Sequence, residues 1–158
     1  MSTKKSVFRK LLKLLRLIVF FFIISTIAVT IIYRFVRPPA TPLMMIRLIE
    51  QWSDGEKTKL SKDWIPLEDI SPNMIQAVVA SEDNNFLMHN GIDFEAVKKA
   101  RELNKKRKRL IGASTISQQT AKNVFLWPDR TWLRKGMEVY FTGLIEIILT
   151  SKCERNSC

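Results

Sequence analysis

The chain has a long uncharged apolar run near its N-terminus, and further along it has apolar positions at helical spacing. Residues 17–33, between Arg16 and Arg34, carry no charge and are mostly Ile, Phe and Val. As a helix this run spans about 25 Å, slightly under the bilayer's hydrocarbon thickness of about 30 Å. The flanking arginines can snorkel to the interface, so a transmembrane helix over residues 17–36 is favoured over a buried core helix.

The flanking charges predict how this helix is oriented. Six cations and no acid precede it, namely Lys4, Lys5, Arg9, Lys10, Lys13 and Arg16. Residues 1–16 are therefore predicted to be a cytoplasmic tail, and the chain beyond Arg34 to lie outside the membrane. The segment 34–39 has no small-residue cleavage pattern, which favours an uncleaved signal anchor over a cleavable signal peptide.

Residues 37–70 are predicted to form a juxtamembrane connector. Thr41 followed by Pro42 is typical of a helix start, and the helix is expected to continue through Trp52. Its apolar face consists of Met45, Leu48, Ile49 and Trp52. This face suits either a bilayer surface or packing against the rest of the domain.

Residues 71–152 have apolar positions at helical rather than strand spacing. Ser71-Pro72 predicts one helix, with a buried stripe of Ile75, Val78 and Val79. Three further helices are predicted by their N-caps: one from Asp93 to about Lys105, one from the Thr115 and Gln118 capping box to about Leu126, and one from Thr131. The last has an apolar stripe of Leu133, Met137, Tyr140, Phe141, Leu144 and Ile148. The fold class is therefore mainly α.

The net charge of +11 has a second source besides the N-terminal tail. A basic cluster, relieved only by Glu102, contains Lys98, Lys99, Arg101, Lys105, Lys106, Arg107, Lys108 and Arg109. Its predicted position outside the membrane argues against nucleic acid as a partner. An anionic lipid head group or a diphosphate-linked substrate is the expected counter-charge, and a solvated helix face remains the alternative. One histidine, with Cys153 and Cys158 near the C-terminus, predicts no metal cluster.

Three polar blocks carry the candidate chemistry. In the first, residues 81–91, Glu82 follows the apolar stripe, and partial burial there would make it a stronger base. In the second, residues 112–123, four polar side chains share a helix face near its N-terminus, which suits anions: Thr115, Gln118, Gln119 and Lys122. In the third, residues 134–138, Arg134 and Glu138 are one turn apart. Each block also has an alternative interpretation. In the same order, these are a surface glutamate, a capped surface helix and a weak surface ion pair.

In this order the three blocks resemble the donor-site motifs of bacterial peptidoglycan glycosyltransferases, and the anchor resembles that of the monofunctional kind. The resemblance implies a lysozyme-like helical domain, with Glu82 as catalytic base and Glu138 as second active-site carboxylate. It assigns Lys122 and Arg134 to the substrate diphosphate. The other implied substrate-binding residues are Asp83, Phe86, His89, Ser114, Thr115, Gln118, Gln119, Asn123 and Lys135. His89 is expected to brace its loop, and Gly91 to permit a turn.

The resemblance also implies the reaction and the partners. The enzyme would polymerise lipid II into β-1,4-linked glycan strands at the bacterial cytoplasmic membrane. Its partners would be lipid II, the growing glycan chain, membrane lipids and other cell-wall synthesis proteins. No cofactor is required, although Mg²⁺ or Mn²⁺ can assist at the diphosphate. A membrane-anchored glycan hydrolase and a non-catalytic binding protein remain the alternatives.

The resemblance ends after Lys152. Residues 153–158 do not match the family's continuation and are polar where a helix core is needed. From this we expect a truncated or frame-shifted chain that leaves Phe141, Leu144 and Ile148 partly uncovered and is poorly folded or inactive.

Overall fold

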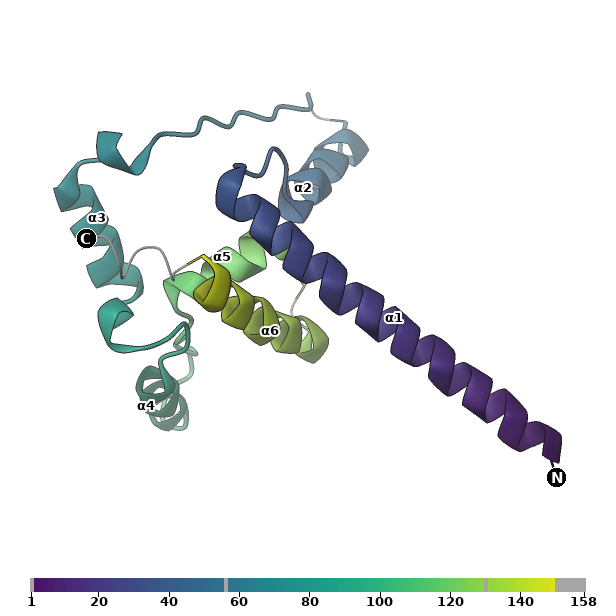
Figure 1. Cartoon of the computed structure of the whole chain (residues 1–158). Coiled ribbons are helices and arrows are strands. Elements are labelled where there is room, and N and C mark those ends of the chain that lie inside the picture. The colour runs from purple at the N-terminus through teal and green to yellow at the C-terminus, as the bar shows by residue number, and fades with distance from the viewer. Residues whose placement is uncertain (1, 56, 130, 150–158) are drawn as a thin grey trace. The chain divides into compact units, whose positions relative to one another are not determined.

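The computed structural model describes residues 2–55, 57–129 and 131–149, and over these ranges the regular structure is entirely helical (Figure 1). The helices are α1 (Ser2–Phe35), α2 (Pro42–Ser53), α3 (Pro72–Glu82), α4 (Phe94–Asn104), α5 (Ile116–Phe125) and α6 (Trp132–Ile148). Two 3-10 turns, Leu67–Asp69 and Phe86–Met88, precede and follow α3. The predicted mainly α class is confirmed. The chain divides into two units, Met1–Arg37 and Pro38–Cys158.

The first unit is a single helix. α1 begins at Ser2, so the predicted tail and span are one continuous helix of 34 residues rather than two segments. No Gly or Pro occurs before Pro38, and the tail is rich in Lys, Arg and Leu, which are good helix formers. Its part from Ser6 to Phe35 is long and apolar enough to cross a membrane. Within it, Thr30 donates a hydrogen bond to the Thr26 carbonyl at 2.8 Å, so this hydroxyl has a partner inside the helix.

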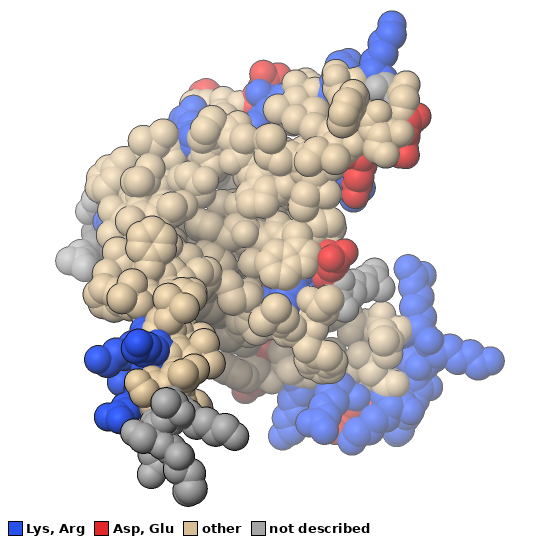
Figure 2. All heavy atoms as spheres, turned by 90° about the vertical axis from the view of Figure 1, so that its right-hand side faces the viewer, with Lys and Arg blue, Asp and Glu red and all other residues tan. Residues whose placement is uncertain are grey.

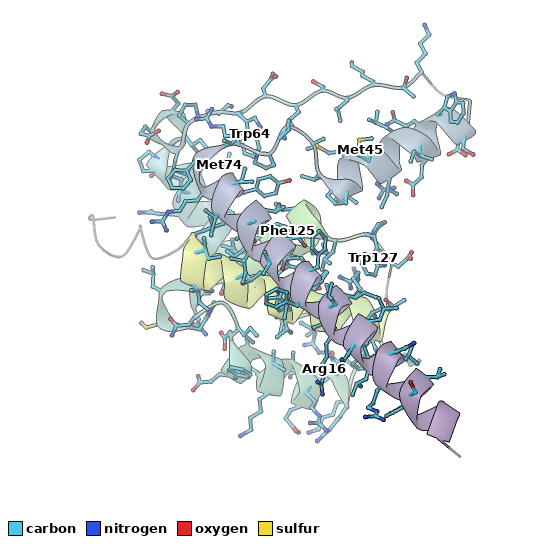
Figure 3. All side chains as sticks on the ribbon, turned by 45° about the vertical axis from the view of Figure 1, so that its right-hand side comes forward. Arg16, Met45, Trp64, Met74, Phe125 and Trp127 are labelled. Carbon is cyan, nitrogen blue, oxygen red and sulfur yellow. The ribbon has the colours of Figure 1, made fainter. Side chains whose placement is uncertain are left out.

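The second unit opens with α2, which starts where the sequence predicts. Thr41 Oγ1 accepts a hydrogen bond from the Met44 N–H at 3.3 Å, and Pro42 stands in the first turn. α2 packs against α5. Of the predicted apolar face, Met45 (labelled in Figure 3), Ile49 and Trp52 are exposed, whereas Leu48 is half-buried.

α3 also starts as predicted, at Pro72, but its apolar stripe is not buried. Val78 is exposed, Ile75 and Val79 are only half-buried, and the Ser71 hydroxyl makes no capping bond. Glu82, the last residue of α3, is itself exposed. The predicted buried stripe and partial burial of Glu82 are therefore wrong: α3 contains no buried residue, because it lacks an extensive contact with another helix within the described residues.

The core lies between α5 and α6. It is built from Ala121, Leu126, Phe141 and Ile145, all fully or nearly fully buried. Phe125 (labelled in Figure 3) stacks on Phe141 with ring centroids 4.5 Å apart. The burial of Leu126, Phe141 and Ile145 contributes about 1.5–3 kcal/mol for each side chain.

The predicted stripe of α6 is only partly correct. Phe141 is buried, so its expected exposure is wrong, whereas Leu144 and Ile148 are half-buried. Leu133 is exposed, and Ile145 takes a place in the core that the predicted stripe omitted. Residues 151–158, including Cys153 and Cys158, lie outside the described residues.

Candidate functional site

Glu82 ends α3 and faces α5. Its Oε2 accepts a hydrogen bond from Gln119 Nε2 at 2.7 Å. The carboxylate is exposed to solvent and has one amide that fixes its orientation. A solvated carboxylate held by one donor keeps lone pairs free to accept a proton from a substrate hydroxyl.

The neighbouring Asp83 connects the first polar block to the second. Its Oδ1 accepts a hydrogen bond from His89 Nε2 at 2.8 Å, and its Oδ2 accepts one from the Ile116 N–H at 3.0 Å. The Asp83 side chain is only 4% exposed. The Phe86 ring meets His89 edge-on, 6.4 Å between centroids. Asp83 thus fixes the loop after Glu82 to the start of α5, and the prediction that His89 braces this loop is confirmed.

Gly91 occupies a position that only glycine fits. Its φ is 76°, in the left-handed region, which confirms the predicted turn. A Cβ on Gly91 would lie 2.6 Å from Glu146 Cγ and 2.9 Å from Thr142 Cγ2 of α6. The Thr115 hydroxyl donates to the Gly91 carbonyl at 2.5 Å. The first block is therefore held against α6 as well as α5, which the sequence did not reveal.

The start of α5 is the predicted capping box. Thr115 Oγ1 accepts from the Gln118 N–H at 3.2 Å, and Gln118 Oε1 accepts from the Thr115 N–H at 3.1 Å. Both residues are buried. Ser117, which the sequence analysis did not select, donates to Glu146 of α6. This helix start thus uses its polar groups to join α5 to its neighbours.

The third block contains a buried carboxylate between two cations. Glu138 Oε2 accepts from Arg134 Nη1 at 2.8 Å, and Glu138 Oε1 accepts from Lys135 Nζ at 2.5 Å. The side chains of Glu138 and Arg134 are 3% and 12% exposed. The pair is therefore not the weak surface interaction that was the alternative. Removing one partner of a buried pair leaves an uncompensated charge and costs about 3–5 kcal/mol.

Two clefts border these groups and share the loop 111–114. The first, the Glu82 cleft, is lined by Glu82, Lys99 and Ser114 among others. The second, the Lys135 cleft, is lined by Lys135, Arg101 and Ser114 among others. Lys135 Nζ also donates to Ser114 Oγ at 3.5 Å. The loop thus lies between the exposed carboxylate of Glu82 and a group of cations.

Asp93 supports the floor of the Glu82 cleft. Its Oδ1 accepts from the Ala96 N–H at 2.7 Å, which caps α4 as predicted, and its Oδ2 accepts from Asn85 Nδ2 at 2.9 Å. The hydrogen bonds from Ala96 and Asn85, in this order, lower the pKa of Asp93 below its usual value. The bond from Asn85 was not predicted, because nothing local in the sequence pairs it with Asp93.

The structure brings several of the predicted site residues into two groups. One is Glu82 with Gln119, and the other is Ser114, Lys135, Glu138 and Arg134. Asp83, His89, Thr115 and Gln118 form hydrogen bonds within the protein, so their contact with a substrate stays a prediction. Lys122 is half-buried and Asn123 exposed on α5. Their side chains bond to neither group over the described ranges, and their roles also stay predictions.

The carboxylates of the site do not form a cage for the predicted divalent cation. Within residues 2–55, 57–129 and 131–149, no three His, Cys, Asp or Glu side chains form a metal-binding group. Both oxygens of Asp83 and of Glu138 are already hydrogen-bonded. The exposed carboxylates that line the Glu82 cleft are Glu82 and Glu95, and a protein-built site for Mg²⁺ or Mn²⁺ needs more oxygen ligands than these two supply. The described residues therefore do not form a protein-built cation site.

The relationship of this chain to known proteins rests on its middle and C-terminal parts. The family model described as transglycosylase matches residues 47–152, which is more than half of the chain and includes all three polar blocks. The chain belongs to the transglycosylase family. All three blocks of the site, from Glu82 to Glu138, thus lie within the transglycosylase match.

Several curated transglycosylases are similar to this chain. A biosynthetic peptidoglycan transglycosylase of Bacteroides thetaiotaomicron is 53% identical over 139 residues, covering 88% of this chain and 56% of that protein. One of Rhodospirillum centenum is 56% identical over 120 residues, covering 76% and 50%. One of Bdellovibrio bacteriovorus is 53% identical over 128 residues, covering 81% and 51%. The chain spans about half the length of these relatives.

Proposed function

We propose that this protein is a peptidoglycan glycosyltransferase that polymerises lipid II into β-1,4-linked glycan strands with inversion at the anomeric carbon. The observation that carries the proposal is that loop 111–114 lies between two clefts, one bordered by a carboxylate and the other by a cation. An accessible carboxylate, Glu82, borders one cleft, and a cation held by a buried carboxylate, Lys135, borders the other. A glycosyl transfer from a diphosphate needs a base on one side and positive charge on the other.

Glu82 acts as the general base. The acceptor's sugar hydroxyl attacks the anomeric carbon of the growing chain, and its proton passes to Glu82. The new C–O bond forms as the bond from the anomeric carbon to the diphosphate oxygen breaks. Gln119 holds the carboxylate through Oε2, so Oε1 is the oxygen that takes the proton.

Lys135 and Arg134 stabilise the departing polyprenyl diphosphate. Glu138 is buried and bonded to both cations, so its role is to hold them in place rather than to exchange protons. Preorganised cations cost no reorganisation when the leaving group gains charge. Lys122 is proposed as a further diphosphate contact on the strength of the motif alone.

The site works at a membrane surface. α1 is proposed to span the bacterial cytoplasmic membrane once, with its basic N-terminus in the cytoplasm and the second unit outside. Both substrates carry a polyprenyl tail, so an anchored enzyme meets them in the same bilayer. Other cell-wall synthesis proteins remain proposed partners. No step of the reaction is assigned to a divalent cation.

Product analysis with the full chain in detergent tests this function. Labelled lipid II should be consumed, with release of polyprenyl diphosphate and formation of long glycan strands. Cleavage of preformed glycan without polymer formation would instead support the hydrolase. Lipid II binding without turnover would support the non-catalytic binding protein, and either result would contradict the proposal.

A further inference from the structure

A closed, basic loop follows α4. We define the basic loop as residues 105–110, with the sequence Lys-Lys-Arg-Lys-Arg-Leu. The two residues that flank the loop, Asn104 and Ile111, are joined by two hydrogen bonds. Asn104 Nδ2 donates to the Ile111 carbonyl at 3.0 Å, and Asn104 Oδ1 accepts from the Ile111 N–H at 2.8 Å. A two-bond clamp of this kind holds the ends of the loop together and projects its side chains outward.

Every residue of the basic loop is exposed. Lys105 pairs with Glu102 at 2.8 Å, whereas the four cations from Lys106 to Arg109 have no ion-pair partner among the residues that the structure describes. Figure 2 shows Lys and Arg side chains gathered at its lower right, where α4 and the loop lie. The loop ends in Leu110, whose 76% exposure places an apolar side chain beside this charge.

The loop is separate from the clefts of the candidate site. Lys105 lines the Lys135 cleft, but Lys106, Arg107, Lys108 and Arg109 line neither cleft. The four cations are therefore not explained by the diphosphate of a substrate bound there. A surface that combines unpaired cations with an exposed leucine is typical of binding at a membrane interface, where phosphates attract the charges and the apolar side chain enters the head-group region.

We propose that the basic loop is a docking surface for anionic phospholipid head groups of the membrane that holds α1. A membrane is favoured over nucleic acid because α1 is long and apolar enough to anchor the chain, and because no aromatic residue occurs in the loop to stack on bases. Each Lys or Arg close to an anionic surface contributes roughly a fivefold gain in binding. The loop thus provides a second, charge-dependent attachment of the second unit to the bilayer.

Amide hydrogen exchange of the full chain in lipid nanodiscs tests the proposal. Exchange over residues 104–112 should be slower in discs containing phosphatidylglycerol than in discs of phosphatidylcholine alone. Added salt should remove the difference, because it screens the attraction. Lys106→Gln with Lys108→Gln should reduce the protection by an order of magnitude or more, about fivefold for each cation. Adding Leu110→Ser to this double variant should reduce the protection further.

The matched control is Lys57→Gln with Lys59→Gln, which removes the same charge from exposed positions in the connector. It should leave the protection unchanged. Equal exchange in both kinds of disc, or an equal loss in both double variants, would overturn the proposal. Protection by added RNA but not by phosphatidylglycerol would also overturn it, in favour of a nucleic-acid surface. Lipid II is absent throughout, so this result is independent of the proposed catalysis.

Discussion

Asp83 Oδ2 accepts a hydrogen bond from the backbone N–H of Ile116, 33 residues further along the chain, at 3.0 Å. This bond joins the end of α3 to the first residue of α5, so it sets where Glu82 lies relative to Gln119. Two polar blocks that are far apart in sequence become one site through a single buried carboxylate.

Asp83→Ala should destabilise the protein by about 1–3 kcal/mol, because it leaves the buried N–H of Ile116 and the ring of His89 without their acceptor. Denaturant unfolding in detergent measures this loss. Asp63→Ala, at an exposed position, is the control and should change stability by less than about 0.5 kcal/mol. Equal effects of the two variants would show that the Asp83 bonds do not support the fold.

Gly91→Ala should cost at least about 1–2 kcal/mol from its left-handed backbone alone. The new Cβ would also clash with Glu146 and Thr142, so the total loss should be larger. Gly136→Ala is the matched control: its Cβ meets nothing within 4 Å, and alanine in a helix is better than glycine by about 0.5–1 kcal/mol. Thermal unfolding should therefore move in opposite directions for the two variants. A stable Gly91→Ala would refute the close approach to α6.

Gln119→Ala should slow polymerisation by about tenfold or more, because Glu82 loses the one donor that orients it and a hydrogen bond to a charged group is worth about 1.5–3 kcal/mol. The measurement is the initial rate of lipid II consumption at saturating substrate. Thr120→Ala, on the exposed side of the same helix, should retain the parent rate. An unchanged rate in Gln119→Ala would show that the Gln119 amide does not contribute to catalysis.

The lowered pKa of Asp93 predicts an acid-sensitive contribution to stability. Because the pKa is lower in the folded than in the unfolded state, this contribution is complete above the usual aspartate pKa of about 3.9 and is lost as the pH falls through the lower, folded value. Thermal unfolding of the parent and of Asp93→Asn should therefore differ at neutral pH, and the difference should shrink as the pH falls below about 4 and vanish below the folded-state pKa of Asp93. A difference that persists unchanged in acid would contradict the assignment.

Local signals made most helix starts predictable. Thr41, Asp93, Thr115 and Thr131 all cap helices where the sequence placed them, since a cap depends on residues within one turn. Burial was less predictable, because periodicity identifies an apolar face but not its neighbour. The incomplete burial of the α3 stripe and the burial of Glu138 both depend on which helices meet.

The sequence selects candidate site residues but does not predict the hydrogen bonds that join them. The motif resemblance selected Glu82, Gln119 and Glu138, and the structure supplies the hydrogen bonds that hold each of them. Glu146 lies outside the three blocks and Asn85 lies within the first, and neither carries a local signal for its partner. Their contacts arise from packing between segments that are distant in sequence.

The initial rate of glycan polymerisation by Glu82→Gln tests the central claim most directly. The amide is isosteric but cannot accept the hydroxyl proton, so polymerisation should fall by at least about 100-fold. Glu68→Gln, an exposed glutamate outside the clefts, should polymerise labelled lipid II at the parent rate. Polymer formed by Glu82→Gln at the parent rate would contradict the assignment of Glu82 as the base.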